Sequence, residues 1–217
     1  MKRLFPMICL VMFHCAGQPE RWSELRASLQ QPPLMLRQTF GEFELRVAYL
    51  PPWMAIKDEI SRHVAASRIA PQAWETLLQA QGRAVQLRLT IRHLAAQGQG
   101  RPWSGGLEGS AATMGGFTEN MYHLLFGLKN RIFLTDGTQR FALAQYLLDR
   151  NWGMGQETRL LLTFPAEVDG QLLKDKAKLS LIIQNLIPGK GEIRFDFPKN
   201  PIAFSARSPD QLAKLVP

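Results

Sequence analysis

The segment VQLRLTIR, residues 85–92, decides the fold of this chain, because apolar and polar residues alternate through it without a break. An apolar side chain at every second position is typical of a β-strand with one buried face. A shift of one residue in the pairing register would bury both Arg88 and Arg92, so the register is well specified. The segment therefore predicts a strand that turns its apolar face toward a core.

The same alternation recurs before and after this segment. Residues 43–49 alternate in the same way, and the pair Asp136-Gly137 is typical of a type I′ hairpin turn. Further strands are expected at Tyr122–Leu128, Arg131–Thr135, Gln139–Gln145, Arg159–Phe164, Leu179–Leu186 and Glu192–Phe197. Many short strands joined by tight turns, with no long helix between them, predict a mainly β chain folded as an antiparallel sandwich.

Two stretches interrupt the strand pattern. Residues 55–81 contain apolar residues at helical spacing and a Pro at an expected helix start, so they predict a short helical insertion after the first strand. Residues 97–116 contain seven glycines and no apolar period, which predicts a long flexible loop. Loops of this length inside a domain are often functional. This loop is therefore the first candidate for a recognition surface.

The N-terminal residues 1–17 are typical of an export signal. Lys2 and Arg3 precede an apolar core at residues 4–13. A core of this length is too short to span about 30 Å of hydrocarbon as a helix, but it suits a secretory signal peptide. We therefore expect the protein to be exported.

Cys15, at the end of this signal, suggests a lipoprotein-type signal peptide that is cleaved before Cys15. The cysteine would then carry the lipid that anchors the protein to a bacterial membrane. His14 departs from the lipoprotein pattern, in which a small residue precedes the cysteine. The alternative is cleavage after Gly17, which would give a soluble periplasmic or secreted protein. No other cysteine follows Cys15, so we expect no disulfide within the mature chain.

The remaining boundaries follow from composition. We expect residues 18–40 to form a tether with a short helix, residues 41–200 to form the sandwich domain, and residues 201–217 to form a C-terminal tail.

The hydrophobic fraction of 46% and charged fraction of 20% are those of a globular protein. The formal net charge of +8 favours anionic partners, but the basic residues are scattered. Scattered basic residues in an exported chain argue against a nucleic-acid partner.

Three stretches resemble a known group of proteins: FELRVAYLPP at residues 43–52; the pair IFLTDGTQRFALAQYLLDRNWG (132–153) and RLLLTFP (159–165); and LSLIIQNLIPGKGEIRFDF at residues 179–197. They resemble poorly characterised bacterial envelope lipoproteins built around an immunoglobulin-like β-sandwich. The resemblance implies that fold, an envelope location and a non-catalytic binding or structural role. It transfers no binding residues to this chain.

The residue types of common catalytic and metal sites do not form recognisable motifs. His63, His93 and His123 lack the spacing that places two metal ligands on one face of a helix or strand. No Gly-x-Ser-x-Gly motif or dinucleotide fingerprint is present. We therefore expect no metal, no cofactor and no catalytic residues. The alternative function is a periplasmic hydrolase of an envelope polymer, for which two carboxylates would have to converge from separate strands.

Two pairs of residues form the candidate binding surface. Arg101 and Trp103 lie in the glycine-rich loop, and Arg150 and Trp152 lie in the polar segment DRNWG. An arginine can bind an anion through two hydrogen bonds, and an exposed tryptophan is a frequent anchor in interfaces. An envelope protein is the expected partner.

Overall fold

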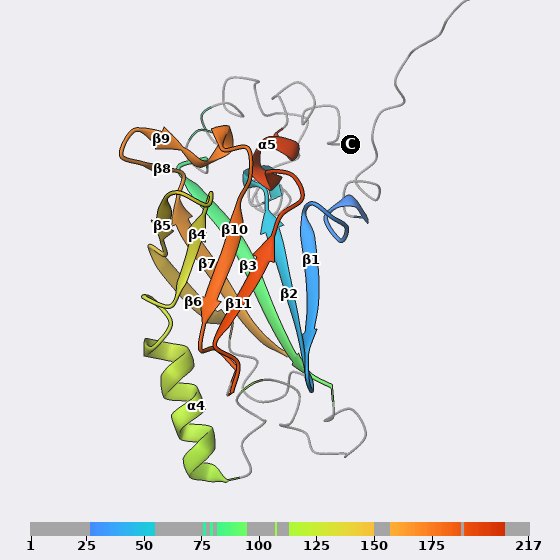
Figure 1. Ribbon diagram of the computed structural model, residues 1–217, viewed down its shortest axis with the longest axis vertical. Coiled ribbons are helices and arrows are strands. Elements are labelled where there is room, and N and C mark those ends of the chain that lie inside the picture. The colour runs from blue at the N-terminus through green and yellow to red at the C-terminus, as the bar shows by residue number, and fades with distance from the viewer. Residues whose placement is uncertain are drawn as a thin grey trace, which may run out of the picture.

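The structure is a computed structural model that describes residues 27–54, 76, 79, 82–94, 107, 113–149, 157–187 and 189–206. The alternating segment lies in strand β3, which is the central strand of a five-stranded antiparallel sheet with the order β1-β2-β3-β7-β6 (Figure 1). The strands of this sheet are β1 (Met35–Phe40), β2 (Phe43–Leu50), β3 (Ala84–His93), β6 (Gln145–Asp149) and β7 (Thr158–Pro165).

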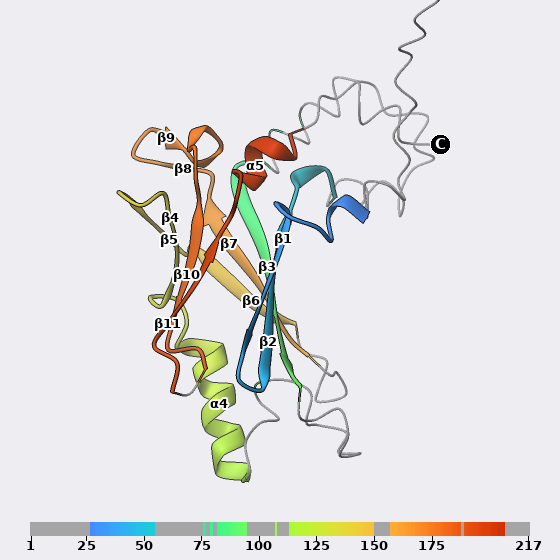
Figure 2. The ribbon, with the colours of Figure 1, turned by 45° about the vertical axis from the view of Figure 1, so that its right-hand side comes forward.

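The second layer is a four-stranded antiparallel sheet with the order β11-β10-β4-β5. Its strands are β4 (Ile132–Thr135), β5 (Arg140–Ala142), β10 (Ser180–Gln184) and β11 (Glu192–Asp196). Figure 2 shows the two sheets as the two layers of a sandwich. Leu45, Leu89, Leu181 and Phe195 come from both sheets and are fully buried in one core.

The smaller elements lie at opposite ends of the sandwich. Helix α4 projects from one end, whereas the hairpin β8-β9 and helix α5 lie at the other (Figures 1 and 2). These elements are α4 (Met114–Phe126), β8 (Glu167–Val168), β9 (Gln171–Leu172), the 3₁₀ helix η4 (Leu173–Asp175) and α5 (Pro201–Phe204).

The prediction of a mainly β, antiparallel fold is confirmed. In an immunoglobulin constant-type domain the third strand crosses to the second sheet, whereas β3 here pairs with β2. The immunoglobulin-like connectivity is therefore not confirmed. The expected insertion at residues 55–81 lies outside the described residues, except for Thr76 and Gln79, which are helical and exposed.

The prediction of a strand at Tyr122–Leu128 is wrong, because most of this segment belongs to α4. Apolar residues at 122, 124, 126 and 128 mimic a strand, but Leu124 and Leu128 are both buried and lie four residues apart, which is the helical spacing. The helix begins after Thr113, whose hydroxyl accepts a hydrogen bond from the backbone N–H of Gly116 at 3.2 Å. The helical spacing of the buried residues and the cap at Thr113 favour a helix more strongly than the alternation of apolar residues favours a strand.

The same helix corrects the extent of the predicted loop. Residues 114–116 form the first turn of α4, so the expected loop 97–116 ends earlier. Leu107, inside that range, is buried in the core, and its backbone N–H donates a hydrogen bond to the Thr158 hydroxyl at 2.8 Å. The prediction of a flexible loop throughout 97–116 is therefore wrong at Leu107.

Two of the expected domain boundaries also differ from the structure. Strand β1 lies within the predicted tether 18–40 and pairs with β2 along its whole length, so the sheet begins at Met35. At the other end, α5 occupies the start of the predicted tail 201–217, and both Pro201 and Ser205 are buried. Both segments form part of the domain: β1 pairs with β2 and packs the half-buried Leu36 and Phe40 against the core, and α5 contributes the buried Pro201.

The hairpin predicted at Asp136-Gly137 forms between β4 and β5, but its turn is not of type I′. Among the described residues other than glycine, only Asp169 and Asn185 have a positive φ. The Asp136 carboxylate instead accepts hydrogen bonds from the backbone N–H groups of Thr138 and Gln139, at 2.9 and 2.8 Å. This local bonding, typical of Asp in turns, replaces the left-handed conformation.

Candidate functional site

A pocket of about 880 Å³ lies at the end of the sandwich that carries α5. Its apolar lining includes Tyr49 and Trp53 at the end of β2, Val85 at the start of β3, Leu172 in β9 and Ile202 in α5. Pockets of this size suit small organic ligands. The site is therefore assembled from segments that are far apart in the sequence.

The two aromatic residues of the pocket have their polar atoms bonded within the protein. Trp53 is 4% exposed, and its indole Nε1 donates a hydrogen bond to the backbone carbonyl of Ser205 at 3.2 Å. Tyr49 is 2% exposed; burial raises the pKa of its hydroxyl to about 12, although a hydrogen bond with the Ser205 side chain opposes the shift. Burial disfavours the charged phenolate. These two residues therefore back the pocket wall, and the half-buried Leu172 and Ile202 contribute more of its accessible apolar surface.

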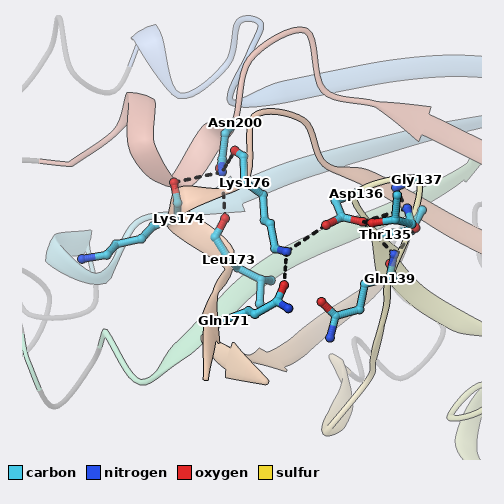
Figure 3. Close-up of polar contacts among 10 residues, drawn as sticks. Thr135, Asp136, Gly137, Gln139, Gln171, Leu173, Lys174, Lys176 and Asn200 are labelled. Carbon is cyan, nitrogen blue, oxygen red and sulfur yellow. Dashed lines mark hydrogen bonds and ion pairs between the residues drawn. The ribbon is translucent and has the colours of Figure 1, made fainter. Parts of the chain in front are cut away.

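The wall formed by η4 and α5 is held by Asn200 (Figure 3). The side-chain amide nitrogen of Asn200 lies 2.8 Å from the carbonyl oxygen of Leu173, 2.7 Å from that of Lys176 and 3.2 Å from that of Lys174. Its side-chain oxygen accepts a hydrogen bond from the backbone N–H of Ile202, which caps the start of α5. One buried side chain thus fixes α5 against η4.

An ion pair joins the segment after η4 to the β4-β5 turn. Lys176 Nζ lies 2.9 Å from a carboxylate oxygen of Asp136 and also donates a hydrogen bond to the side-chain oxygen of Gln171 (Figure 3). The backbone N–H groups of Gln139 and Thr138, followed by Lys176, hold the pKa of Asp136 well below its usual range. Asp136 is therefore ionised at neutral pH and holds Lys176 in place.

Charged side chains of both signs line the outer part of the pocket. They are Arg83, Glu167, Lys174 and Asp175, and all four residues are exposed. Apolar walls with a few polar groups favour a ligand that has an apolar body and a polar end. Glu167 and Asp175 place two carboxylates in one pocket, as the hydrolase alternative needs, although Asp175 comes from η4 and not from a strand.

A second unusual surface lies on α4, at the opposite end of the sandwich (Figure 2). Met114, Tyr122 and Phe126 are exposed by 79, 68 and 67%, and the rings of Tyr122 and Phe126 lie 5.1 Å apart. Large apolar side chains grouped on a surface are typical of interaction sites. Leu124 is the buried residue of this helix.

The candidate residues from the sequence analysis cannot be compared with the site, because the structure does not describe them. Cys15, Arg101, Trp103, Arg150 and Trp152 all lie outside the described residues. Sequence reasoning missed the pocket, although one signal was present: an aromatic residue on each side of a proline pair, in the segment YLPPW at residues 49–53. The other pocket residues carry no motif that would have grouped them.

Two of the three histidines considered as metal ligands, His93 and His123, lie within the described residues. His93 Nε2 lies 3.0 Å from Glu42 Oε2, and its ring lies 4.9 Å from that of Phe43. His123 lies beside Arg131; burial first, and then this guanidinium, lower the pKa of the imidazole. Within the described ranges, no three His, Cys, Asp or Glu side chains are grouped so that they could hold a metal ion.

None of the helices in the described part of the chain has the length and hydropathy that crossing a membrane requires.

The chain matches no protein-family model, and no curated protein matches it. It is similar to one solved structure, the crystal structure of a novel protein of unknown function from Burkholderia pseudomallei. The similarity covers 87% of this chain and 88% of that one, with 13% sequence identity and a TM-score of 0.39. At this TM-score the similarity supports no argument about shared fold or shared function.

Proposed function

We propose that this protein is a non-catalytic binding module of the bacterial cell envelope, and that it binds a small amphipathic molecule in the pocket beside Trp53. The observation that carries the proposal is the chemistry of that pocket. Its walls present mainly aliphatic surface backed by two buried aromatic rings, and its charged groups lie on its exposed part. Such a site places the apolar body of a ligand inside and leaves the polar end near water.

A series of ligands with one head group and chains of increasing length tests this proposal. Burial of each CH₂ contributes about 0.8 kcal/mol, so affinity should rise about fourfold per added carbon until the pocket is full. Calorimetry with hexanoate, octanoate and decanoate below their micellar concentrations measures this slope. Affinity that is independent of chain length contradicts the proposal. Decylphosphocholine and decyltrimethylammonium then show which charge the outer residues prefer.

A variant that fills the pocket provides the matched control. Ala203 lines the pocket and is exposed, so Ala203→Trp should lower decanoate affinity at least tenfold without removing a buried contact. Ala142 is exposed on β5 and does not line the pocket, so Ala142→Trp should leave the affinity unchanged. If both variants lower the decanoate affinity equally, the ligand binds outside this pocket.

The envelope location rests on the N-terminal signal, and we propose that a lipid on Cys15 tethers the protein to a membrane there. Incorporation of radiolabelled fatty acid should be lost in the variant Cys15→Ala. A mature N-terminus at Gln18 would contradict the anchor and favour a soluble exported protein.

The second candidate function is a hydrolase acting on an envelope polymer, which the presence of Glu167 and Asp175 in one pocket favours. Glycoside hydrolases use two carboxylates, one of which is kept protonated by an apolar environment. Both carboxylates here are exposed, which favours the binding role. Release of soluble reducing ends from purified cell-wall sacculi, abolished by either Glu167→Gln or Asp175→Asn, would instead support the hydrolase.

A further inference from the structure

Five arginines lie on the outer face of the five-stranded sheet. Arg46, Arg88 and Arg159 each lie between two buried residues of their strands, and register and alternation place Arg37 and Arg92 on the same face, so the side chains point away from the sandwich core. We call this surface the arginine face, and its arginines are Arg37, Arg46, Arg88, Arg92 and Arg159.

Three of these arginines lie in one row across the sheet. Arg37 of β1 pairs directly with Arg46 of β2, Arg46 pairs with Thr90 of β3, and Thr90 pairs with Arg159 of β7. Like charges directly opposite each other destabilise a sheet. A direct Arg37–Arg46 pair is therefore unfavourable for folding unless something compensates it.

Two carboxylates that contact the arginines of this row offset the repulsion between Arg37 and Arg46. Glu44 lies 3.3 Å from Arg37 and accepts a hydrogen bond from Arg46 Nε at 2.6 Å. Glu157 lies 3.2 Å from Arg159 and 4.0 Å from Arg46. The carboxylates are the less exposed partners: the Glu44 side chain is 11% exposed, against 54% for Arg37.

This arrangement leaves donors pointing outward. Each guanidinium carries five N–H donors, and two carboxylates cannot occupy the donors of three guanidinium groups. Asp149 pairs with Arg159 at the edge of the sheet, so the face holds five arginines against three carboxylates. The surface is therefore net positive, and the row formed by Arg37, Arg46 and Arg159 has more N–H donors than Glu44 and Glu157 can accept, which leaves donors for an external anion.

Apolar side chains lie among the arginines. The row that contains Arg88 runs from Met35 on β1 through Arg88 on β3 to Leu161 on β7 and Leu147 on β6, and Leu147 is 64% exposed. The arginines are thus distributed over several rows of the sheet face, with apolar side chains between them. A linear acidic polymer would use only the row of three arginines, whereas a lipid surface matches a broad face that carries both cations and apolar side chains.

We propose that the arginine face docks onto the surface of an anionic phospholipid bilayer, through phosphate groups on the guanidinium donors and shallow contact of Leu147. This proposal is independent of the pocket and of the acyl anchor on Cys15. Because the attraction acts between exposed charges, it should weaken strongly with added salt.

Vesicle sedimentation tests the proposal with the full-length chain carrying Cys15→Ser, so that no acyl chain is attached. We expect binding to vesicles with 30% phosphatidylglycerol to exceed binding to pure phosphatidylcholine, and to fall in about 0.5 M salt. The double variant Arg37→Gln/Arg159→Gln should lower binding about 25-fold, roughly fivefold for each charge.

The matched control removes two charges elsewhere. Lys129 and Lys190 are exposed and lie outside the arginine face, so Lys129→Gln/Lys190→Gln should change binding less than threefold. Unchanged thermal midpoints would show that both double variants fold. An equal loss in both double variants, or binding to an acidic polysaccharide but not to the vesicles, overturns the proposal.

Discussion

The indole N–H of Trp53 donates a hydrogen bond to the backbone carbonyl of Ser205, which lies 152 residues later in the chain. The bond joins the helical turn after β2 to the end of α5 and closes one side of the pocket. The pocket thus depends on a contact between the first and last described parts of the domain.

Replacing Trp53 by Phe should destabilise the domain by about 1–3 kcal/mol, because a buried carbonyl loses its donor and part of the ring contact is lost. Urea unfolding followed by far-UV circular dichroism measures the change. Tyr122→Phe is the control at an exposed aromatic position and should change the stability by less than about 0.5 kcal/mol. Equal effects would show that the Trp53 bond contributes little.

Asn200 should tolerate neither Ala nor Asp, for different reasons. Asn200→Ala removes both the cap of α5 and the donors to η4, and we expect a loss of about 2–4 kcal/mol. Asn200→Asp keeps the capping oxygen but places a carboxylate against the Leu173 and Lys176 carbonyls. Unfolding measurements should therefore show at least as large a loss for Asp; a fully stable Asp variant would contradict this role.

The Asp136–Lys176 pair should make stability depend on pH in the acid range. The pKa of Asp136 is lowered in the folded state, so its contribution is present above about pH 4 and is lost as the pH falls. Asp136→Asn should cost roughly 1–2 kcal/mol at pH 7, and the difference should shrink toward pH 2. Asp169→Asn, in the exposed β8-β9 turn, is the control and should be nearly neutral. A cost that does not change with pH would contradict the ionised pair.

Tyr49 should make the stability of the domain depend on pH in the alkaline range. Its pKa is raised to about 12, so the folded state holds the phenolic proton longer than the unfolded state. Stability is therefore unaffected below about pH 10 and falls as the pH rises from 10 toward 12. Ultraviolet titration of tyrosine should show one group ionising near pH 12, and Tyr49→Phe should remove it. Retention of that group in the variant would assign it to another tyrosine.

The strands that could be predicted from sequence are those with one buried face. In β3 and β11 every second residue is buried, so the alternation fixes both element and register. Strand β1 was missed because it is an edge strand whose side chains are only partly buried, so its residues show no strict alternation. Its existence depends on pairing with β2, which is a tertiary contact.

The helix α4 shows how a short pattern can mislead. Apolar residues at positions 122, 124, 126 and 128 fit a strand, and Gly115 and Gly116 lower the helix propensity of its first turn. Periodicity over a short window does not separate a strand from an apolar helix. The exposed aromatic residues of α4 were consequently assigned to a sheet.

The candidate site could not be predicted because it has no local signature. Trp53, Leu172 and Ser205 approach one another only after the two sheets have packed and Asn200 has fixed α5. The arginine face could not be predicted either, because its residues are scattered in the sequence and only strand pairing places them on one surface.

The location of a bound amphiphile tests the central claim most directly. In the chain without substitutions and with decanoate bound, we predict intermolecular nuclear Overhauser effects from the terminal methyl group of the ligand to the side chains of Leu172 and Ile202, which line the pocket and are half-buried. The exposed side chains of Met114, Tyr122 and Phe126 on α4 form the competing site in the same experiment. Contacts confined to Tyr122 and Phe126, with none to the pocket, would contradict the account.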